Sequence, residues 1–244
     1  MSPSVPFNPL DKRNLAESVA LAALDHDARP LTLANTEDVA GEGVYLIYYC
    51  GPFEAYARLR LVNSPTVLTM PIYVGKALHA GGRKGIEDTT AGDPAGAPLR
   101  KRLREHLKSI EAAQNLDAAD FFFRHLSVDN TFVALGENGL INKFVPLWNA
   151  LIDGFGNHAP GGNRGTSIRS RWDTLHPGRS WARDLQDRSE TAQTIADDAS
   201  EYLRARIASP IRGVDVQGAP VELTVEVESA GLRPDDSGSL PTGV

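Results

Sequence analysis

The chain has 244 residues, of which 41% are hydrophobic and 7% aromatic. This length allows one domain with a sizeable core, or one domain with appendages. No apolar stretch approaches the length of a membrane span and the N-terminus has no apolar signal core, so we expect a cytoplasmic protein with no membrane contact. The single cysteine, Cys50, excludes an intramolecular disulfide and a cysteine-based zinc site, and we expect it to be a buried small apolar residue.

The net charge of −6 is unevenly distributed. Residues 184–244 hold 12 acidic and 5 basic side chains, a net charge of −7, so residues 1–183 carry a net +1. Within this first part the segments 76–108 and 164–183 are basic. Clustered charge sets a local field that attracts phosphate. Ordinary solvated faces are the alternative interpretation of both segments.

The first part of the chain is expected to be a helical arm that comprises residues 1–40. Asn8-Pro9 is a helix-start signal, and the apolar residues that follow at helical spacing predict a helix to about Asp25. A polar loop then leads to the next element.

Two predicted strands follow, at residues 44–49 and 70–74, with a short helix expected between them at 52–62. β-Branched and aromatic residues bounded by Gly and Pro are typical of strands. The strands carry the strings Gly43-Val44-Tyr45 and Tyr73-Val74-Gly75. Pairing would bring the two tyrosines together, and the glycines would leave room for the backbone of a bulky ligand.

The clearest predicted helix begins at Pro98, after an expected excursion loop at 80–97. Arg102 and His106 are four residues apart, so they lie on one helix face at the border of the apolar stripe. The stripe consists of Leu99, Leu103, Leu107 and Ile110.

The second half of the chain is expected to alternate between regular elements and a glycine-rich loop before it reaches an acidic end. The last fifteen residues have the composition of a disordered segment. The expected elements are a strand at 119–128, a helix at 133–144, a loop at 154–165, a helix at about 190–207 and a half-exposed strand at 221–227.

Six polar residues occur in an order that resembles a known active site. They are two strand tyrosines, an arginine and a histidine on one helix, a glutamate and, twelve residues later, an asparagine: Tyr45, Tyr73, Arg102, His106, Glu137 and Asn149. This order resembles the active site of the GIY-YIG nuclease superfamily. The closer resemblance, over roughly residues 5–185, is to its type II restriction endonucleases, and it is carried by Leu135–Ile141, Phe144–Asn149, Asp153–His158 and Trp172–Arg179.

Some features depart from that pattern or do not discriminate between its branches. The string Tyr73–Ala77 also resembles excision-repair incision subunits. Val44 stands where the superfamily name has isoleucine, and the gap between the two tyrosines is longer than the usual hairpin. No counterpart can be placed for the chain beyond residue 185.

The resemblance implies an α+β fold, with a small, mainly antiparallel GIY-YIG sheet flanked by helices, an N-terminal helix and a C-terminal appendage. Residues 41–185 would form the catalytic and DNA-recognition domain, and 186–244 a helix with an acidic, partly disordered tail. The implied activity is Mg²⁺-dependent hydrolysis of both strands of a short palindrome in double-stranded DNA, GC-rich and of the CCGCGG kind in the nearest relatives. One hydrolytic site severs one strand, so a duplex break implies a homodimer.

Phosphodiester hydrolysis needs an activated water and positive charge around the phosphorus. Mg²⁺ uses few protein ligands, so Glu137 alone is a sufficient candidate for the metal ligand; a surface glutamate is the alternative. Arg102 offers a planar fork to phosphate oxygens. Tyr45 and His106 both remain candidates for the general base, because an unperturbed phenol is a poor base and would need a nearby cation.

Tyr73 would orient the water or a phosphate oxygen, and Asn149 would brace the site through hydrogen bonds. Basic and polar side chains in the two charged segments and the glycine-rich loop are candidates for DNA contact. They are Lys76, Arg100, Arg104, Asn157, His158, Arg164, Arg169 and Arg171. His158 could also suggest a His-metal nuclease, but it has no partner at metal-site spacing.

Two other functions stay open from the sequence. A structure-specific or repair nuclease would have the same chemistry without reading a base sequence. A non-catalytic DNA-binding protein would keep the fold alone, and the full set of six polar residues argues against it.

Overall fold

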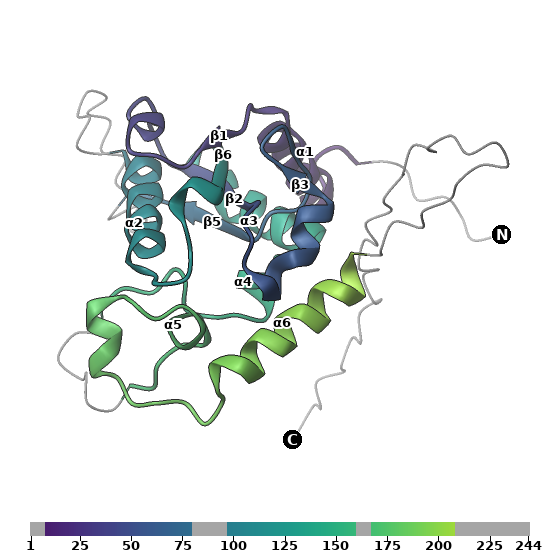
Figure 1. Cartoon of the computed structure of the whole chain (residues 1–244). Coiled ribbons are helices and arrows are strands. Elements are labelled where there is room, and N and C mark those ends of the chain that lie inside the picture. Colours follow the sequence, from purple (N-terminus) through teal and green to yellow (C-terminus); the bar gives the residue numbers. More distant parts are fainter. Residues whose placement is uncertain (1–7, 80–96, 160–166, 208–244) are drawn as a thin grey trace, which may run out of the picture.

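The computed structural model describes residues 8–79, 97–159 and 167–207 (Figure 1). A four-stranded antiparallel sheet with the order β1-β6-β2-β5 lies among helices, which confirms the expected α+β class. Its strands are β1 (Arg29–Pro30), β2 (Gly43–Tyr49), β5 (Tyr73–Ala77) and β6 (Phe121–Ser127). The helices are α1 (Lys12–Asp25), α2 (Pro98–Ala112), α3 (Asn130–Phe144), α4 (Leu147–Ala150), α5 (Arg171–Leu175) and α6 (Ala192–Arg206), with 3₁₀ turns η1 (Ala34–Thr36), η2 (Glu54–Leu61), η5 (Ala118–Asp120) and η7 (Ser180–Asp184).

Every residue of β2 is buried, because helices cover both faces of the sheet at its centre. Side chains alternate between the faces, so Tyr45 and Ile47 join the core that contains the apolar stripe of α2, while Val44 and Leu46 join the core beneath α1 and α3. β2 therefore separates two cores, and its tyrosine belongs to the α2 side.

Helix α1 packs along α3 at two glycines. A Cβ on Gly136 would lie 2.4 Å from Cγ1 of Val19, and one on Gly139 would lie 3.0 Å from Cβ of Ala16. Small residues thus allow the close approach that sets the position of α3 against the sheet. The helix begins later than the sequence suggests, since Asp11 and not Asn8 caps it, with Oδ1 accepting from the Arg13 amide at 2.8 Å.

The long connection between β2 and β5 contains η2 and a two-stranded hairpin of β3 (Asn63–Ser64) and β4 (Val67–Leu68). The buried Asn63 side chain ties its ends together. Its amide nitrogen donates to the carbonyls of Tyr49 and Met70, at 3.2 and 2.8 Å, and its oxygen accepts from the amides of Thr69 and Met70 at 3.0 Å. The extra length is therefore accommodated without separating β2 from β5.

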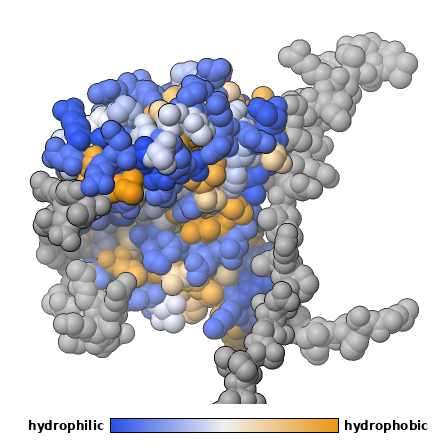
Figure 2. All heavy atoms as spheres, turned by 90° about the horizontal axis from the view of Figure 1, so that it is seen from below, coloured by the Kyte–Doolittle hydropathy of each residue, from blue (hydrophilic) through white to orange (hydrophobic). Residues whose placement is uncertain are grey.

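Helix α6 extends across the lower part of the molecule in Figure 1 and packs against η2 and α5. In Figure 2, the described part of the lower face carries separate apolar patches among hydrophilic residues. No helix within the described ranges is both long and apolar enough to span a membrane.

Two further expectations have different outcomes. Cys50 is only partly buried, which corrects the expectation of full burial: it follows the last residue of β2, at the margin of the core. The expected strand at 221–227 and the excursion loop at 80–96 lie outside the described residues.

Candidate active site

Tyr45, Tyr73 and His106 meet on the α2 side of the sheet. The Tyr45 hydroxyl lies 2.7 Å from Nε2 of His106, and both residues are buried. The Tyr73 ring lies 6.3 Å from the Tyr45 ring and 5.3 Å from the imidazole, measured between centroids. The register of β2 and β5 produces this cluster, because Tyr45 pairs with Gly75 and Tyr73 with Ile47.

The glycine of the second string makes space for a tyrosine of the chain itself. A Cβ on Gly75 would lie 2.3 Å from the Tyr45 hydroxyl. We expected room for a ligand backbone at this position, and the structure corrects that reason: the ring of Tyr45 fills the space. A glycine at position 75 is therefore a condition for the Tyr45–His106 hydrogen bond.

Burial is the main cause of the pKa shifts of Tyr45 and His106. It raises the pKa of Tyr45 well above its usual value, and the nearby Arg102 lowers that pKa only in part. Burial, followed by the positive charges of Arg102, Arg179 and His158, holds the pKa of His106 well below its usual value. With the imidazole neutral and its proton on Nδ1, Nε2 accepts the hydrogen bond that the protonated Tyr45 hydroxyl donates.

Arg102 directs its guanidinium into the same cluster from α2. Nη1 donates to Oε2 of Glu105 at 3.0 Å and to Nε2 of His158 at 2.7 Å, and Nη2 donates to the Gly156 carbonyl at 2.7 Å. The arginine is about one-fifth exposed, at 22% of its side chain. It thus combines a fixed orientation with access to solvent.

The loop at 154–158 lies against the cluster and adds a residue that the sequence did not indicate. The Phe155 ring stacks on His106 with 4.4 Å between centroids and 15° between planes, and its edge meets Tyr73 at 5.0 Å. A Cβ on Gly156 would lie 2.9 Å from the Tyr73 hydroxyl and 3.1 Å from Nη2 of Arg102. The glycine-aromatic content of Asp153–His158 was the available signal, but it did not distinguish support of the site from DNA contact.

Glu137 reaches the site from α3, past the edge strand β5. Its Oε2 lies 2.6 Å from Nζ of Lys76, with side-chain exposures of 16% for the glutamate and 40% for the lysine. After burial, the negative charge of Glu137 also contributes to raising the pKa of both Tyr45 and Tyr73, so the carboxylate lies close enough to act electrostatically on both phenols. Glu137 lies next to Gly136, whose close contact with α1 sets this part of α3 in place.

Glu137 fits the requirements of a Mg²⁺ ligand. In the part of the chain that the structure describes, no group of three or more His, Cys, Asp or Glu side chains is suited to a metal. Mg²⁺ is nevertheless commonly held by one or two carboxylates together with waters and substrate phosphates. The contact with the Lys76 ammonium shows that the carboxylate already selects a cation.

Asn149 acts on the backbone of β5. Its Oδ1 accepts from the Val74 amide and its Nδ2 donates to the Val74 carbonyl, both at 2.8 Å. β5 is an edge strand of the sheet, so one of its sides has no neighbouring strand. The side-chain amide of Asn149 makes the hydrogen bonds to Val74 that such a strand would make. Asn149 therefore holds in place the strand that carries Tyr73 and Lys76.

The turn between α3 and Asn149 is strained and is held by α6. Val145 has φ of 41°, a left-handed conformation that is costly for a β-branched residue. The Tyr202 hydroxyl donates to the Val145 carbonyl at 2.6 Å, and Nη2 of Arg206 donates to the Phe144 carbonyl at 3.1 Å. Side chains from α6 thus stabilise the turn that separates Glu137 from Asn149.

The candidates for DNA contact divide into three groups. Lys76 and His158 lie beside the cluster, and His158 lines a pocket of about 150 Å³ together with Arg102 and Lys108. Asn157 lines the same pocket. Arg100 and Arg104 contact another part of the chain: Nε of Arg100 donates to the Val39 carbonyl at 3.1 Å, and Nε of Arg104 donates to the Thr36 hydroxyl at 3.0 Å.

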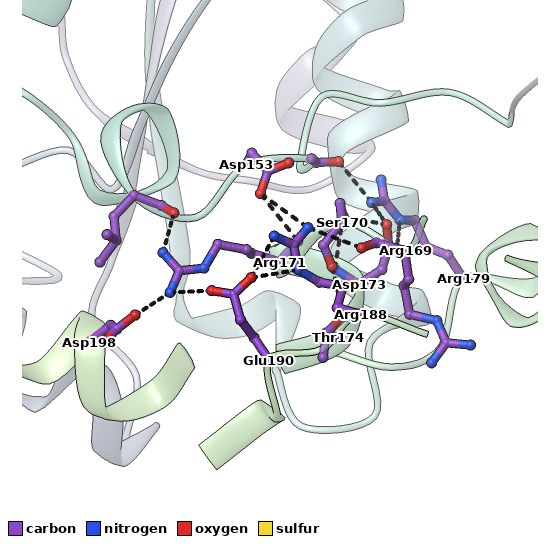
Figure 3. A network of polar contacts seen from close by, with 12 residues as sticks. Asp153, Arg169, Ser170, Arg171, Asp173, Thr174, Arg179, Arg188, Glu190 and Asp198 are labelled. Atoms are coloured by element: carbon purple, nitrogen blue, oxygen red, sulfur yellow. Dashed lines mark hydrogen bonds and ion pairs between the residues drawn. The ribbon is translucent and has the colours of Figure 1, made fainter. Parts of the chain in front are cut away.

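The third group contains Arg169 and Arg171, which belong to a network of polar contacts within the chain (Figure 3). Nη1 of Arg169 contacts Asp187 at 2.7 Å and its Nε donates to the Ala182 carbonyl at 3.0 Å. Arg171 is 12% exposed, donates to the Leu151 carbonyl at 3.0 Å and pairs with Glu190 and Asp198. Arg164 lies outside the described residues.

This arrangement places the chain among the GIY-YIG nucleases. More particularly, the chain belongs to the restriction endonuclease family described as the Eco29kI GIY-YIG domain, whose family model matches residues 37–203. No curated protein matched the chain. The match continues through most of α6, beyond the end of the resemblance at residue 185, and this agrees with the contacts that α6 makes to the turn at Val145.

Proposed function

We propose that the protein is a type II restriction endonuclease that hydrolyses one phosphodiester bond in each strand of a short palindromic site, with Mg²⁺. The observation that carries the proposal is the 2.7 Å hydrogen bond between the buried Tyr45 hydroxyl and a neutral His106. This pair has a direction for proton transfer, and it lies beside an arginine and across β5 from a carboxylate. A purely binding protein has no need for such an arrangement of buried polar groups.

The proposed general base is the pair. Tyr45 takes a proton from the attacking water as its own proton passes to Nε2 of His106. The raised pKa of Tyr45 disfavours a stored phenolate, so the two transfers are coupled. Tyr73, whose hydroxyl lies close to Nη2 of Arg102, orients the water or a phosphate oxygen.

Arg102 and Glu137 supply the two charges. The guanidinium donates to the phosphate oxygens in place of one of its present partners, and its fork matches their geometry. Glu137 holds the Mg²⁺, which when bound supplies positive charge to neutralise the developing negative charge on phosphate. Lys76 leaves the carboxylate and turns toward the DNA backbone, for which its 40% exposure leaves room.

Recognition is proposed to involve Lys76, Asn157, His158 and Arg164, with Arg100 and Arg104 as further candidates. The carboxylates paired with Arg169 and Arg171 argue against a DNA contact by these two arginines. One site cuts one strand, so cleavage of a palindrome calls for a homodimer whose two-fold axis matches that of the DNA. By the resemblance to relatives that cut CCGCGG-like sequences, the proposed site is GC-rich.

Plasmid digestion with Mg²⁺, followed by sequencing of the fragment ends, tests this function. Discrete fragments with one common palindromic sequence at their ends are the expected result, and sedimentation should show a dimer. Random nicks or cleavage at junctions would indicate a structure-specific nuclease instead. A Tyr45→Phe variant purified in parallel controls for contaminating nucleases, and an inactive wild type that binds DNA would support the non-catalytic alternative.

A further inference from the structure

We propose that Arg179 is a positioning residue, which shapes the loop at 154–157 so that this loop aligns Arg102, His106 and Tyr73. This inference rests on the proposed nuclease function. It assigns a role to a side chain that touches none of the reacting groups, and it predicts effects that loss of a simple core contact would not cause.

Arg179 is 4% exposed, and its guanidinium contacts one carboxylate and two tryptophan rings. Its Nε and Nη2 donate to the two carboxylate oxygens of Asp173 at 2.6 and 2.7 Å (Figure 3). The guanidinium lies 4.5 Å from the ring centroid of Trp172 and 4.6 Å from that of Trp181. Ser170 donates to Asp173 at 2.6 Å, so the carboxylate is oriented as well. A fixed, fully paired ion in such surroundings tolerates little movement.

The remaining donors of Arg179 all point to the loop. Nη1 donates to the carbonyls of Phe155 and Asn157 at 3.1 and 3.3 Å, and Nη2 donates to the carbonyl of Gly154 at 2.8 Å. Together with the two bonds to Asp173, these contacts employ all of the N–H groups of a guanidinium. A lysine has neither the number nor the planar arrangement of donors to replace them.

The same loop contacts the proposed catalytic residues with its other side. Phe155 stacks on His106 and meets the edge of Tyr73, and the Gly156 carbonyl accepts from Arg102. Carbonyls 154, 155 and 157 are thus held by Arg179, while the ring at 155 and the carbonyl at 156 face the active site. A shift of the loop would move all three catalytic side chains together.

The local backbone leaves little alternative for this arrangement. Gly154 has φ of +103°, and a Cβ there would lie 2.1 Å from the Ser170 hydroxyl oxygen.

The positive charge of Arg179 also contributes, after burial and Arg102, to lowering the pKa of His106. The other groups that act on this imidazole are His158, Tyr45 and Tyr73.

The variants Arg179→Lys and Asp173→Asn test the inference, with Arg124→Lys as a matched control. Arg124 also donates to carbonyls, of His26 and Leu68 at 2.9 and 3.1 Å, but it lies over Tyr48 in the core beneath α1 and α3. Single-turnover cleavage at saturating enzyme, DNA affinity without Mg²⁺, thermal unfolding and the pKa of His106 by NMR should be measured for each folded protein.

Arg179→Lys is expected to slow cleavage by roughly 100-fold while DNA affinity changes by less than about threefold. The variant would displace the catalytic groups but would not alter the residues that bind DNA. Lysine keeps the positive charge, but a shifted Phe155 would leave His106 less buried, so the pKa of His106 should rise and the acid limb of the pH–rate profile should move to higher pH. Arg124→Lys should lower the Tm by a similar amount with cleavage within about threefold of the wild type. Asp173→Asn, which keeps the volume of the side chain, should slow cleavage less than Arg179→Lys does, again with DNA affinity within about threefold of the wild type.

A folded Arg179→Lys protein with an unchanged His106 pKa and normal single-turnover cleavage would overturn the inference. A Tm loss in both Arg179→Lys and Arg124→Lys with equal cleavage rates would also overturn it, since Arg179 would then only stabilise the core. The NMR titration separates this outcome from failure of the proposed function: if the wild type cleaves no DNA, a raised His106 pKa in Arg179→Lys would still support the positioning role.

Discussion

Arg102 on α2 belongs to the basic segment 76–108, and Arg171 and Arg179 belong to the basic segment 164–183, yet these arginines make different contacts. Arg102 contacts a single carboxylate, that of the partly exposed Glu105, and its other donors go to His158 and a carbonyl, so part of its charge remains available to a ligand. Arg171 and Arg179 are instead surrounded by carboxylates and carbonyls. Arg102 is proposed to contact the substrate, whereas Arg171 and Arg179 hold neighbouring segments of the chain in place.

The difference shows that a basic run does not by itself define a DNA-binding surface. The charges of Arg169, Arg171 and Arg179 are balanced by acidic groups that lie near them in space, namely Asp173, Asp187, Glu190 and Asp198. The field that phosphate experiences depends on unpaired charge and not on composition. The following predictions test this distinction, from the largest expected effect to the smallest.

Glu137→Ala should reduce cleavage by about 10³-fold or more while DNA binding stays within a few-fold, because the variant loses the proposed metal ligand and also a negative charge that repels phosphate. Cleavage assays in Mg²⁺ and gel-shift measurements check this. The exposed Glu111 on α2 provides the control, as Glu111→Ala should behave like the wild type. Cleavage by Glu137→Ala within tenfold of the wild type would contradict the metal assignment.

Arg102→Lys should be nearly as damaging as Arg102→Ala, with each about 10²-fold slower in single turnover, because both lose the planar fork. Arg60→Lys, an exposed arginine of η2, serves as the control. Near-normal turnover by Arg102→Lys would mean that only the charge at this position matters, and the contrast with Arg171 would lose its geometric basis.

The pH–rate profile should stay level as the pH falls through 6.5 and decline only at lower pH, because the lowered pKa of His106 keeps its acceptor nitrogen free. Stability must be measured in parallel. His106 and His176, whose pKa burial lowers to about 3, have lower pKa values folded than unfolded, so they contribute stability above pH 6.5 that is lost as the pH falls toward the folded values. A rate that falls by half near pH 6.5 with no loss of folded protein would exclude the low pKa of His106.

Arg171→Gln should lower the free energy of unfolding by about 2 kcal/mol and leave the salt dependence of DNA binding unchanged. Its terminal nitrogens are occupied by Leu151, Glu190 and Asp198, so stability is the expected readout. Denaturant unfolding and DNA titrations at several salt concentrations provide the measurement. A slope of log K against log salt that drops by ~0.9 would show a lost phosphate contact and would remove Arg171 from the internal group.

Most of the regular elements were predictable because their signals are local. Pro98 begins α2 as expected, the strands follow their β-branched and aromatic runs, and the spacing of Arg102 and His106 places them on one face. Glu137 and Asn149 became candidates through the family resemblance. No sequence periodicity could predict that these two residues would lie against β5.

The support of the site was not predictable in the same way. Phe155 and Arg179 act through a loop whose shape depends on tertiary contacts, and composition alone cannot tell a supporting loop from a recognition loop. The two carboxylates that pair with Arg171 are those of Glu190 and, on α6, Asp198, and both lie beyond the segment that carried the resemblance. Pairing between distant segments decides which charges remain free, and sequence spacing contains no information about it.

The strained turn at Val145 has a consequence for how the enzyme is made. The six proposed active-site residues have all been synthesised by position 149, but the side chains that hold the turn between Glu137 and Asn149 come from Tyr202 and Arg206. A nascent chain therefore carries all of these groups well before it can fix their arrangement. Contacts of such sequence separation form late and slowly, so we expect activity to emerge only after α6 has left the ribosome and docked.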